Sequence, residues 1–365
     1  MTQETSPPVA GSRIRRVLSR SRRRAVLWII ALVAALCAAL LLAVGVGSVS
    51  IGPVRVLDVL VEHLTGVEIG PGASATQDAI VWQVRAPRVV LAAFVGAGLA
   101  VCGMALQAMV RNMLADPQLL GISSGASCGA AASILFGFTL GGGEHALQAM
   151  AFLGALGASV LVYATARSGG RLTSVRLLLA GVAVGYALNA LTSFLIFASG
   201  SAEGTRSVMF WLLGSLSLAS WGTPLAAVVV IASVTVVVLS LQGRRLDALA
   251  LGDDLGRALG ARPGQLRLLA FVAIVLLCGA ATAVAGPIGF LGLVVPHALR
   301  LLVGADWRWI LALAPLAGAN LLLLADTLGR RVALPGELEA GIVCALLGTP
   351  VLLALIIRSA RRVRP

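Results

Sequence analysis

One short stretch of this sequence matches a catalytic pattern. Gly121-Ile-Ser123-Ser-Gly125 satisfies G-x-S-x-G, the nucleophile motif of many hydrolases. That motif implies a reactive serine only where a strand turns sharply into a helix and an acid and a histidine follow. Here it opens an apolar segment in which Gly121, Gly125 and Gly129 recur every four residues, a spacing typical of closely packed membrane helices. We therefore predict that these glycines serve helix packing and that the chain has no catalytic residue.

The lysine, histidine and cysteine content of the chain argues against several kinds of catalytic and metal-binding site. All 28 basic residues are arginines, and without a lysine the chain cannot form a Walker A phosphate loop or a Schiff base. His63, His145 and His297 are far apart, and the five cysteines lie in apolar segments without metal or redox spacing. The cysteines are Cys37, Cys102, Cys128, Cys278 and Cys344. We predict that they act as buried small hydrophobic residues and that the chain binds no metal ion.

The elements that carry these residues are long and apolar. Hydrophobic residues make up 59% of the chain, charged residues 12%, and the mean hydropathy is +0.98. A helix needs about 20 apolar residues to cross a bilayer, whereas barrel strands are shorter and alternate. Ten segments qualify, some at the short end: Ala25–Val49, Val89–Val110, Leu119–Leu140, Ala146–Ala166, Leu177–Phe197, Leu225–Leu241, Leu268–Val284, Ile288–Val303, Trp309–Leu324 and Ile342–Ile357. We predict an all-α, polytopic membrane protein with ten transmembrane helices, of which the first is retained because it exceeds a signal-peptide core.

The net charge of +13 reports topology rather than nucleic-acid binding. On the ten-helix arrangement, 22 of the 28 arginines fall on one side of the membrane. Arg55, Arg85, Arg88, Arg206, Arg330 and Arg331 fall on the other. The positive-inside rule then puts both termini and the long loop 243–267 in the cytoplasm, with anionic lipid as a secondary contact. Residues 1–24 are predicted to form an Arg-rich cytoplasmic tail and residues 25–360 the membrane domain.

The loop 243–267 is longer than a simple reversal of the chain requires. It carries two short helical patterns that meet at Gly252. In the second pattern Asp253 is a candidate N-cap, Leu255, Ala258 and Leu259 share one face, and Gly260 and Pro263 end the turn. A helix this short is marginal by itself, so its apolar face predicts a partner in the cytoplasm.

The opposite side has three notable features. Val54–Leu64 is amphipathic and is predicted to lie along the membrane surface. Ser207–Ala219 is too short to cross and is predicted to be a half-helix that enters from outside. Four arginines, Arg85, Arg88, Arg330 and Arg331, flank helix ends. Their charge is compatible either with interfacial anchoring or with outward-facing guanidinium groups that bind carboxylates of a soluble partner.

Four blocks of sequence resemble the permease subunits of ABC importers for iron–siderophores, haem and cobalamin. The blocks are residues 85–127, 171–185, 251–260 and 285–308, and the last continues through 324–331 and 335–353. Only the N-terminal tail and the first outer loop lie outside the resemblance. The chain departs from the usual family pattern in two places: Met113 replaces a proline in RNPLADP, and ELPVG becomes Glu337-Leu-Glu339-Ala-Gly341.

The resemblance implies the fold of the vitamin B12 importer permeases, with ten helices per subunit and two permeases, identical or related, around a central path. Two ATPase subunits would bind ATP and magnesium, so this chain would need no cofactor and would not be an enzyme. It implies ATPase docking through the coupling loop by Asp253, Leu255, Gly256, Ala258, Leu259 and Gly260. It implies docking of an extracytoplasmic binding protein by Arg85, Arg88 and Arg330.

The resemblance also implies a cytoplasmic gate and a translocation path. Thr173 and Ser174 would form the gate, and Asn189, Thr192 and Ser193 would contribute polar groups to the path or hydrogen-bond neighbouring helices. Ferric siderophore is the leading cargo, followed by haem and cobalamin. A secondary transporter is the main alternative, but it would normally place ionisable residues at mid-membrane, where these segments have almost none. An intramembrane enzyme would need a catalytic pair, and Ser123 has no evident histidine partner.

Overall fold

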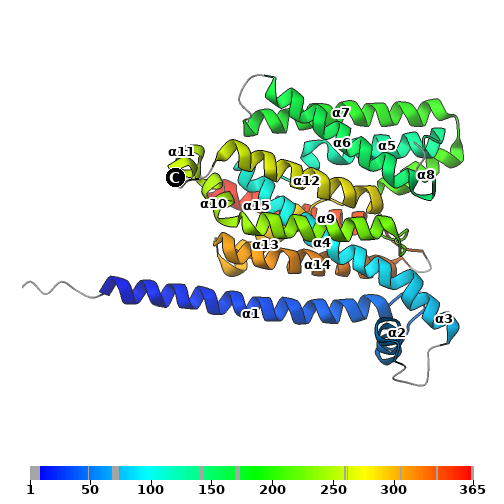
Figure 1. Cartoon of the computed structure of the whole chain (residues 1–365), viewed down its shortest axis with the longest axis horizontal. Helices are drawn as coiled ribbons and strands as arrows, with labels where there is room; N and C mark the ends of the chain where they lie inside the picture. Colours follow the sequence, from blue (N-terminus) through cyan, green and yellow to red (C-terminus); the bar gives the residue numbers. More distant parts are fainter. Residues whose placement is uncertain are drawn as a thin grey trace, which may run out of the picture.

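The computed structural model describes residues 9–47, 49–67, 74–139, 143–168, 173–258, 260, 262–304, 306–333 and 336–362. Within these ranges all regular structure is helical, which confirms the all-α prediction. Most of the long helices run side by side along one axis (Figure 1). The elements are α1 (Val9–Gly45), α2 (Pro53–Thr65), α3 (Ala75–Asp78), η1 (Ala79–Arg85), α4 (Ala86–Val110), η2 (Pro117–Leu120), α5 (Ile122–Phe136), η3 (Gly143–His145), α6 (Ala146–Arg167), α7 (Ser174–Ser199), α8 (Ala202–Leu212), α9 (Thr223–Leu241), α10 (Gly243–Leu251), α11 (Asp253–Ala258), α12 (Pro263–Ala285), α13 (Leu291–Val303), α14 (Trp307–Val332) and α15 (Ala340–Arg362).

Seven helical stretches of the described chain are long and apolar enough to cross a membrane. The third, eighth and tenth predicted segments coincide with shorter apolar helices, α5, α13 and the first part of α15. The third is shorter than predicted because Gly137 adopts a left-handed conformation (φ 66) and ends α5 before Leu140. The multi-pass helical architecture is therefore present, while the count of ten spans stays a prediction.

The second predicted segment begins earlier in the structure than in the sequence analysis. α3, η1 and α4 form one helical stretch from Ala75 to Val110 instead of starting at Val89. The helix continues through Pro87, which follows directly on the π-helix η1. A widened turn of this kind relieves the requirement for the hydrogen bond that proline cannot donate.

α4 lies at the centre of the bundle and packs against α9, α12, α13 and α14. The α4–α14 contact is a close backbone approach, because a Cβ atom on Gly96 would lie 2.4 Å from the carbonyl oxygen of Gly318. The α5–α6 contact is equally close: a Cβ atom on Gly125 would lie 2.4 Å from the carbonyl oxygen of Gly154. The second contact confirms that G-x-S-x-G here serves helix packing.

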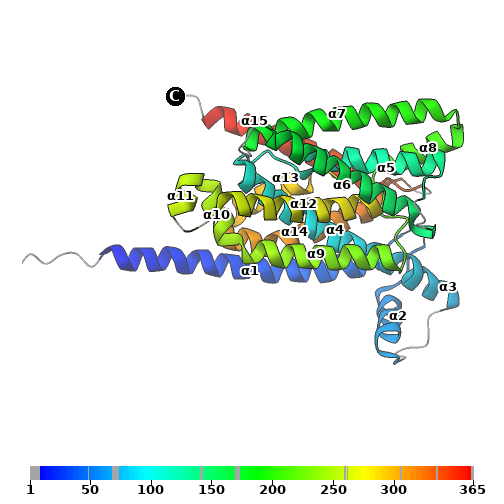
Figure 2. The ribbon, with the colours of Figure 1, turned by 45° about the horizontal axis from the view of Figure 1, so that its top comes forward.

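The N-terminal helix and the first outer element frame the bundle. α1 packs on α14, and most of its side chains from Arg23 to Leu42 are exposed. α2 lies across the end of α1, roughly perpendicular to it (Figures 1 and 2), which is compatible with the predicted surface orientation of residues 54–64. The first residues of α1 and the last residues of α15 lie at the same end of the bundle as α10 and α11 (Figure 2).

The short helix between the fifth and sixth predicted segments differs from the prediction. A helix was expected over Ser207–Ala219, but α8 covers Ala202–Leu212. The helix starts earlier because the Ser201 hydroxyl accepts a hydrogen bond from the Gly204 amide at 3.0 Å and caps it. It ends earlier because Gly214 (φ 74) reverses the chain, and the Gly214 carbonyl accepts a bond from the Gly341 amide at 2.9 Å.

Candidate coupling and docking sites

Two ends of the bundle carry the predicted sites. We call the end with α10 and α11 the coupling end and the end with α2 and η1 the distal end (Figure 1). The loop at the coupling end forms two short helices separated by Gly252, as predicted. Gly252 has φ 133, a conformation that favours glycine, and this bend sets α11 at an angle to α10.

α10 is anchored within the chain rather than waiting for a partner. Its side chains Leu246 and Leu249 are fully buried, and the helix packs on α4 and α14. Apolar surface remains beyond them, since Leu251 is 65% exposed, Leu255 is 48% exposed and Ala258 is exposed. The prediction of an unpaired apolar face therefore applies to α11 and the end of α10, and not to the whole loop.

Asp253 connects α11 to two other helices. Its carboxylate accepts two hydrogen bonds from Arg267 of α12, from Nη1 at 3.0 Å and from Nη2 at 2.7 Å, and it also pairs with Arg111 at the end of α4. Arg111 donates a further bond from Nε to the carbonyl oxygen of Leu249, at 3.3 Å. Asp253 was predicted as an N-cap, but the bonds recorded for its side chain are these ion pairs. They fix the orientation of α11.

The remaining predicted docking residues surround this anchor. Gly256 is buried where α11 faces α10, with Ala248 as its neighbour. Gly260 has φ 80 and donates its amide to the carbonyl oxygen of Arg257 at 3.0 Å, which ends the turn as predicted. Leu259 lies outside the described residues.

The predicted gate residues share a cavity with α11. This cavity at the coupling end has a volume of about 840 Å³, and Thr173, Ser174, Asp253 and Leu255 all line it. The Thr173 hydroxyl caps α7 by accepting from the Arg176 amide at 3.4 Å. The Ser174 hydroxyl donates to the carbonyl oxygen of Met109 at 3.2 Å and ties the start of α7 to the end of α4. Gate and coupling residues, far apart in sequence, therefore line one space.

A partly buried carboxyl on α10, that of Asp247, adds an electrostatic constraint to the coupling end. Burial raises the pKa of Asp247 above its usual range, and the neighbouring carboxylate of Asp306 raises this pKa further, whereas Arg308 lowers it. Two like charges held close together cost free energy when both are ionised. The junction between α10 and the start of α14 is therefore sensitive to protonation.

The three predicted docking arginines gather at the distal end, but they do not face outward. Arg85 and Arg88 are each 5% exposed and Arg330 is 3% exposed. Arg85 donates to the carbonyl oxygens of Val44 and Gly45, at 2.8 and 3.1 Å, and Arg330 donates to that of Val46 at 2.9 Å. The prediction of outward guanidinium groups is wrong for this arrangement, because Arg85 and Arg330 bind the unpaired carbonyls at the end of α1 and Arg88 pairs with carboxylates.

Arg88 and Arg330 also share a buried carboxylate. Asp326 of α14, which is 1% exposed, pairs with Arg88 Nη2 at 2.9 Å and with Arg330 Nε at 3.2 Å. Arg88 Nη1 pairs with Glu337 at 2.7 Å, and the Glu337 side chain is 43% exposed. Arg88, Asp326 and Arg330 therefore each have an opposite charge beside them, and Glu337 extends this network to the surface.

The predicted path residues divide between two faces of α7. Asn189 and Ser193 lie on its exposed face with Tyr186 and Phe197, which are 75% and 86% exposed. Thr192 is buried and donates to the carbonyl oxygen of Leu188 at 2.9 Å. Asn189 and Ser193 are therefore accessible on α7 and Thr192 is not, while the role of all three in a path stays a prediction.

Sequence reasoning missed several members of these sites. Asp326, Arg267 and Arg111 were not among the predicted site residues. The sequence features that could have indicated them are the arginines of the coupling loop and Asp326, the acidic residue of the block 324–331. Cys102, Cys278 and Cys344 are buried as predicted, whereas Cys37 is exposed and Cys128 is half-buried. Among the described residues no group of three or more histidine, cysteine or acidic side chains could hold a metal.

Bundled apolar helices, several of them long enough to cross a bilayer, define a polytopic membrane protein. The chain belongs to the FecCD transport family, whose model matches residues 27–358. It is a permease of an ABC importer and is not an enzyme, since ATP hydrolysis in these systems lies in partner subunits. Such permeases work with ATPases and a binding protein, and the chain is a multi-pass protein of the inner membrane.

Three relatives have nearly the same sequence identity to the chain, but their names refer to the transport of different compounds. The chain is 43% identical over 287 residues to the ferric enterobactin transport system permease FepD of Escherichia coli K12, covering 77% of this chain and 83% of the relative. It is 44% identical over 293 residues to the hemin transport system permease HmuU of Yersinia pestis, covering 78% and 86%. It is 41% identical over 286 residues to the vitamin B12 import permease BtuC of Vibrio cholerae, covering 78% and 85%.

A solved structure extends the likeness to three dimensions. It is described as an inward-facing conformation of a metal-chelate type ABC transporter, and it superposes with a TM-score of 0.76 at 29% sequence identity. The match covers 91% of this chain and 99% of that structure's chain. The arrangement of helices is therefore that of an ABC permease.

Proposed function

We propose that this permease carries a ferric siderophore from an extracytoplasmic binding protein into the cytoplasm, driven by ATP. Haem and cobalamin are the alternative cargoes, since relatives named for siderophore, hemin and vitamin B12 transport have nearly equal identity to the chain. Siderophore uptake is preferred because it is the commonest use in the family that the sequence resembles. ATP and magnesium bind to the partner ATPases, and the chain itself needs no cofactor.

The observation that carries the proposal is the shared cavity at the coupling end. In this proposal an ATPase binds the apolar surface of Leu251 and Leu255, and movement of α11 is transmitted through Asp253 to α4 and α12. The gate residues Thr173 and Ser174 line the same cavity, so a shift of α11 alters the space in front of them. A packed two-state element biased by nucleotide is the usual physical basis of such coupling.

The transport path is proposed to form between two permeases, identical or related, and two ATPases then sit below them. The support is the exposed apolar face of α7, where Tyr186, Phe194 and Phe197 are 61% to 86% exposed. Burying apolar surface away from lipid does not by itself stabilise the association of two membrane helices. Close packing and hydrogen bonds between the helices do. Asn189 and Ser193 lie on this face and would contribute polar groups to the path. Ten spans and cytoplasmic termini complete the proposed topology.

The binding protein is proposed to dock at the distal end, with the buried arginines supporting the surface from beneath. Arg88 orients Glu337, whose partly exposed carboxylate reaches the surface. Arg85 and Arg330 hold the end of α1 in place. Docking that released Arg88 from Asp326 would leave a buried carboxylate with one partner fewer, so docking would be coupled to the position of α14.

Uptake in proteoliposomes tests this proposal. The chain, its ATPase and its binding protein are reconstituted, and entry of radiolabelled ferric siderophore, haem and cobalamin is compared. Uptake should require enclosed ATP and the binding protein, and dissipating ion gradients should leave it unchanged. Uptake driven by an ion gradient without ATP would establish the secondary-transport alternative instead, and saturable uptake of haem or cobalamin alone would replace the cargo.

A paired variant tests the coupling surface separately. Leu255→Asp together with Leu259→Asp should reduce co-purification of the ATPase by at least about tenfold, because each buried leucine contributes about 1.5–3 kcal/mol at an interface. Leu255→Met is the control and should retain the ATPase. Co-purification of the double variant at normal yield would contradict the docking role of α11.

A further inference from the structure

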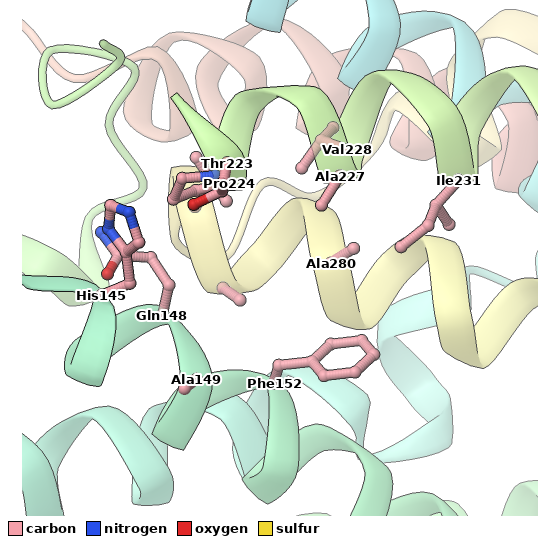
Figure 3. A pocket seen from close by; sticks show the side chains of 12 residues that line it. His145, Gln148, Ala149, Phe152, Thr223, Pro224, Ala227, Val228, Ile231 and Ala280 are labelled. Carbon is pink, nitrogen blue, oxygen red and sulfur yellow. The ribbon is translucent and has the colours of Figure 1, made fainter. Parts of the chain in front are cut away.

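Helices α9 and α12 pack against each other and carry a cavity near each end of the pair. The cavity near the distal end has an apolar interior formed by side chains such as Phe152, Ile231 and Ala280 (Figure 3). The cavity at the coupling end has a volume of about 520 Å³, within the range of about 300–1,000 Å³ that is common for ligand sites. It is separate from the cavity that the gate residues line, and its polar lining can select a ligand by charge.

We call the cavity at the coupling end the arginine pocket. Its polar side chains come from the junction of α9 with α10 and from the start of α12, and they are Gln242, Arg245, Arg262 and Gln265. Arg245 Nη1 donates to Gln242 Oε1 at 3.0 Å, which holds this guanidinium group beside the pocket. Among the described residues, no acidic side chain lines the pocket or forms an ion pair with Arg245 or Arg262. The pocket therefore carries two positive charges that no carboxylate of the described chain neutralises.

The arginine pocket lies where two candidate membrane spans end. The span Thr223–Leu241 ends directly before Gln242, and the span Pro263–Ala285 begins directly after Arg262. The pocket is therefore expected at the depth of the lipid headgroups, where the apolar segments leave the hydrocarbon core. An arginine suits this depth, because its apolar stem can lie along apolar surface while its guanidinium group reaches a polar headgroup.

An exposed apolar face of α12 continues from the pocket into the membrane span. Leu269 lines the pocket and is 38% exposed, and Val272 and Leu276, which are 45% and 38% exposed, follow it along the helix. Their spacing puts the three side chains on one face of α12. At about 1.5 Å per residue, this face extends roughly 10 Å from Leu269 to Leu276. A molecule with an anionic head and a hydrocarbon chain would match the pocket and this face together.

We propose that the arginine pocket binds the headgroup of an anionic phospholipid. The phosphate oxygens accept hydrogen bonds from Arg245 and Arg262, and one acyl chain lies along the exposed face of α12. A headgroup with a net negative charge is preferred, because the two guanidinium groups attract it and repel the ammonium of a choline headgroup. The proposal requires that α9 and α12 cross a membrane, and it is independent of the cargo and of ATP hydrolysis.

Native mass spectrometry of the full chain, released without its ATPase from nanodiscs, tests the site. The nanodiscs contain equal amounts of phosphatidylglycerol and phosphatidylcholine with the same acyl chains. The wild-type chain should retain phosphatidylglycerol in preference to phosphatidylcholine. Arg245→Gln and Arg262→Gln should each lower this preference about fivefold, the size expected for one arginine beside an anionic headgroup. Arg244→Gln is the matched control and should keep the preference, because Arg244 adjoins Arg245 but does not line the pocket.

Two further measurements separate a bound lipid from other anions. Inorganic phosphate in excess should not displace phosphatidylglycerol, because it has no acyl chain to place along α12, and displacement would overturn the proposal. An acidic side chain of the ATPase is the competing occupant, since Gly260 of the coupling loop also lines the pocket. Arg245→Gln and Arg262→Gln should therefore co-purify the ATPase at wild-type yield.

The outcomes that contradict the proposal are distinct. Loss of the ATPase from both pocket variants, together with a wild-type chain that shows no lipid preference, would assign the pocket to the ATPase and overturn the proposal. Equal effects of Arg244→Gln and Arg245→Gln on the lipid preference would overturn it as well, because they would reflect general surface charge. Thermal unfolding checks that each variant is folded.

Discussion

Asp253 of α11 and Arg267 of α12 form a two-bonded ion pair, with nitrogen–oxygen distances of 3.0 and 2.7 Å. The Arg267 side chain is 10% exposed and that of Asp253 is 32% exposed, so water screens the pair only in part. Fork-shaped contacts of this kind fix orientation as well as distance. The pair is therefore the mechanical link between the coupling loop and the helix that follows it.

Breaking this link should uncouple the ATPase from the membrane domain. Asp253→Asn and Arg267→Gln are expected to show an interaction free energy of about 0.5–3 kcal/mol in a double-mutant cycle of thermal unfolding. Each single variant should also reduce the degree to which the binding protein stimulates ATP hydrolysis. Asp254→Asn is the matched control, since Asp254 pairs with Arg257 at the surface of α11, and it should change neither quantity. Additive effects of the two variants would refute the link.

At the distal end, removing the buried Arg88 should lower the free energy of unfolding more than removing the charge of the partly exposed Glu337. Arg88→Ala leaves Asp326 buried with only Arg330 beside it, and the expected loss of stability is about 3–5 kcal/mol. Glu337→Gln affects a side chain that is 43% exposed, and it should leave unfolding nearly unchanged while weakening binding-protein affinity. Thermal unfolding and binding-protein titration on the same samples separate these roles. Equal losses of stability would show that Glu337 is structural too.

Two glycines of α6 should respond oppositely to the same substitution. A Cβ atom on Gly154 would lie 2.2 Å from the carbonyl oxygen of Gly125, so Gly154→Ala should separate α5 from α6 and cost about 1–3 kcal/mol. Gly157 has nothing within 4 Å of such an atom, and Gly157→Ala should be neutral or stabilising because alanine favours the helix by about 1 kcal/mol. Unfolding temperatures of the two variants check this. Similar values would mean that α5 and α6 are not closely packed.

Stability at the coupling end should depend on pH through Asp247. Its pKa is raised in the folded chain by burial and by Asp306, so protonation favours the folded state. This contribution is full below the unfolded pKa of about 3.9 and is lost as pH rises through the raised folded value. Asp247→Asn should therefore melt up to about 2 °C higher than wild type at pH 7, and the difference should vanish near pH 4. A difference that grows on acidification would reverse the sign of this argument.

Several elements could be predicted because their signals are local. The apolar segments, the bend at Gly252 and the close packing of Gly125 depend on the residues themselves and on their near neighbours in sequence. The boundaries were less predictable. η1 carries the second span back to Ala75 and through Pro87, and the Ser201 cap moves α8 toward the N-terminus, because a turn type or a single hydrogen bond decides each case.

The sequence by itself determined the class of protein. A chain with mean hydropathy +0.98, arginines concentrated on one predicted side and no lysine must cross a membrane and cannot hydrolyse ATP through a P-loop. Only the tertiary structure decided which charges are available. Arg85 and Arg330 donate hydrogen bonds to carbonyl oxygens at the end of α1. Arg88 pairs with Asp326, which lies 238 positions away in the chain. Burial and pairing depend on which helices meet, and no local pattern records that.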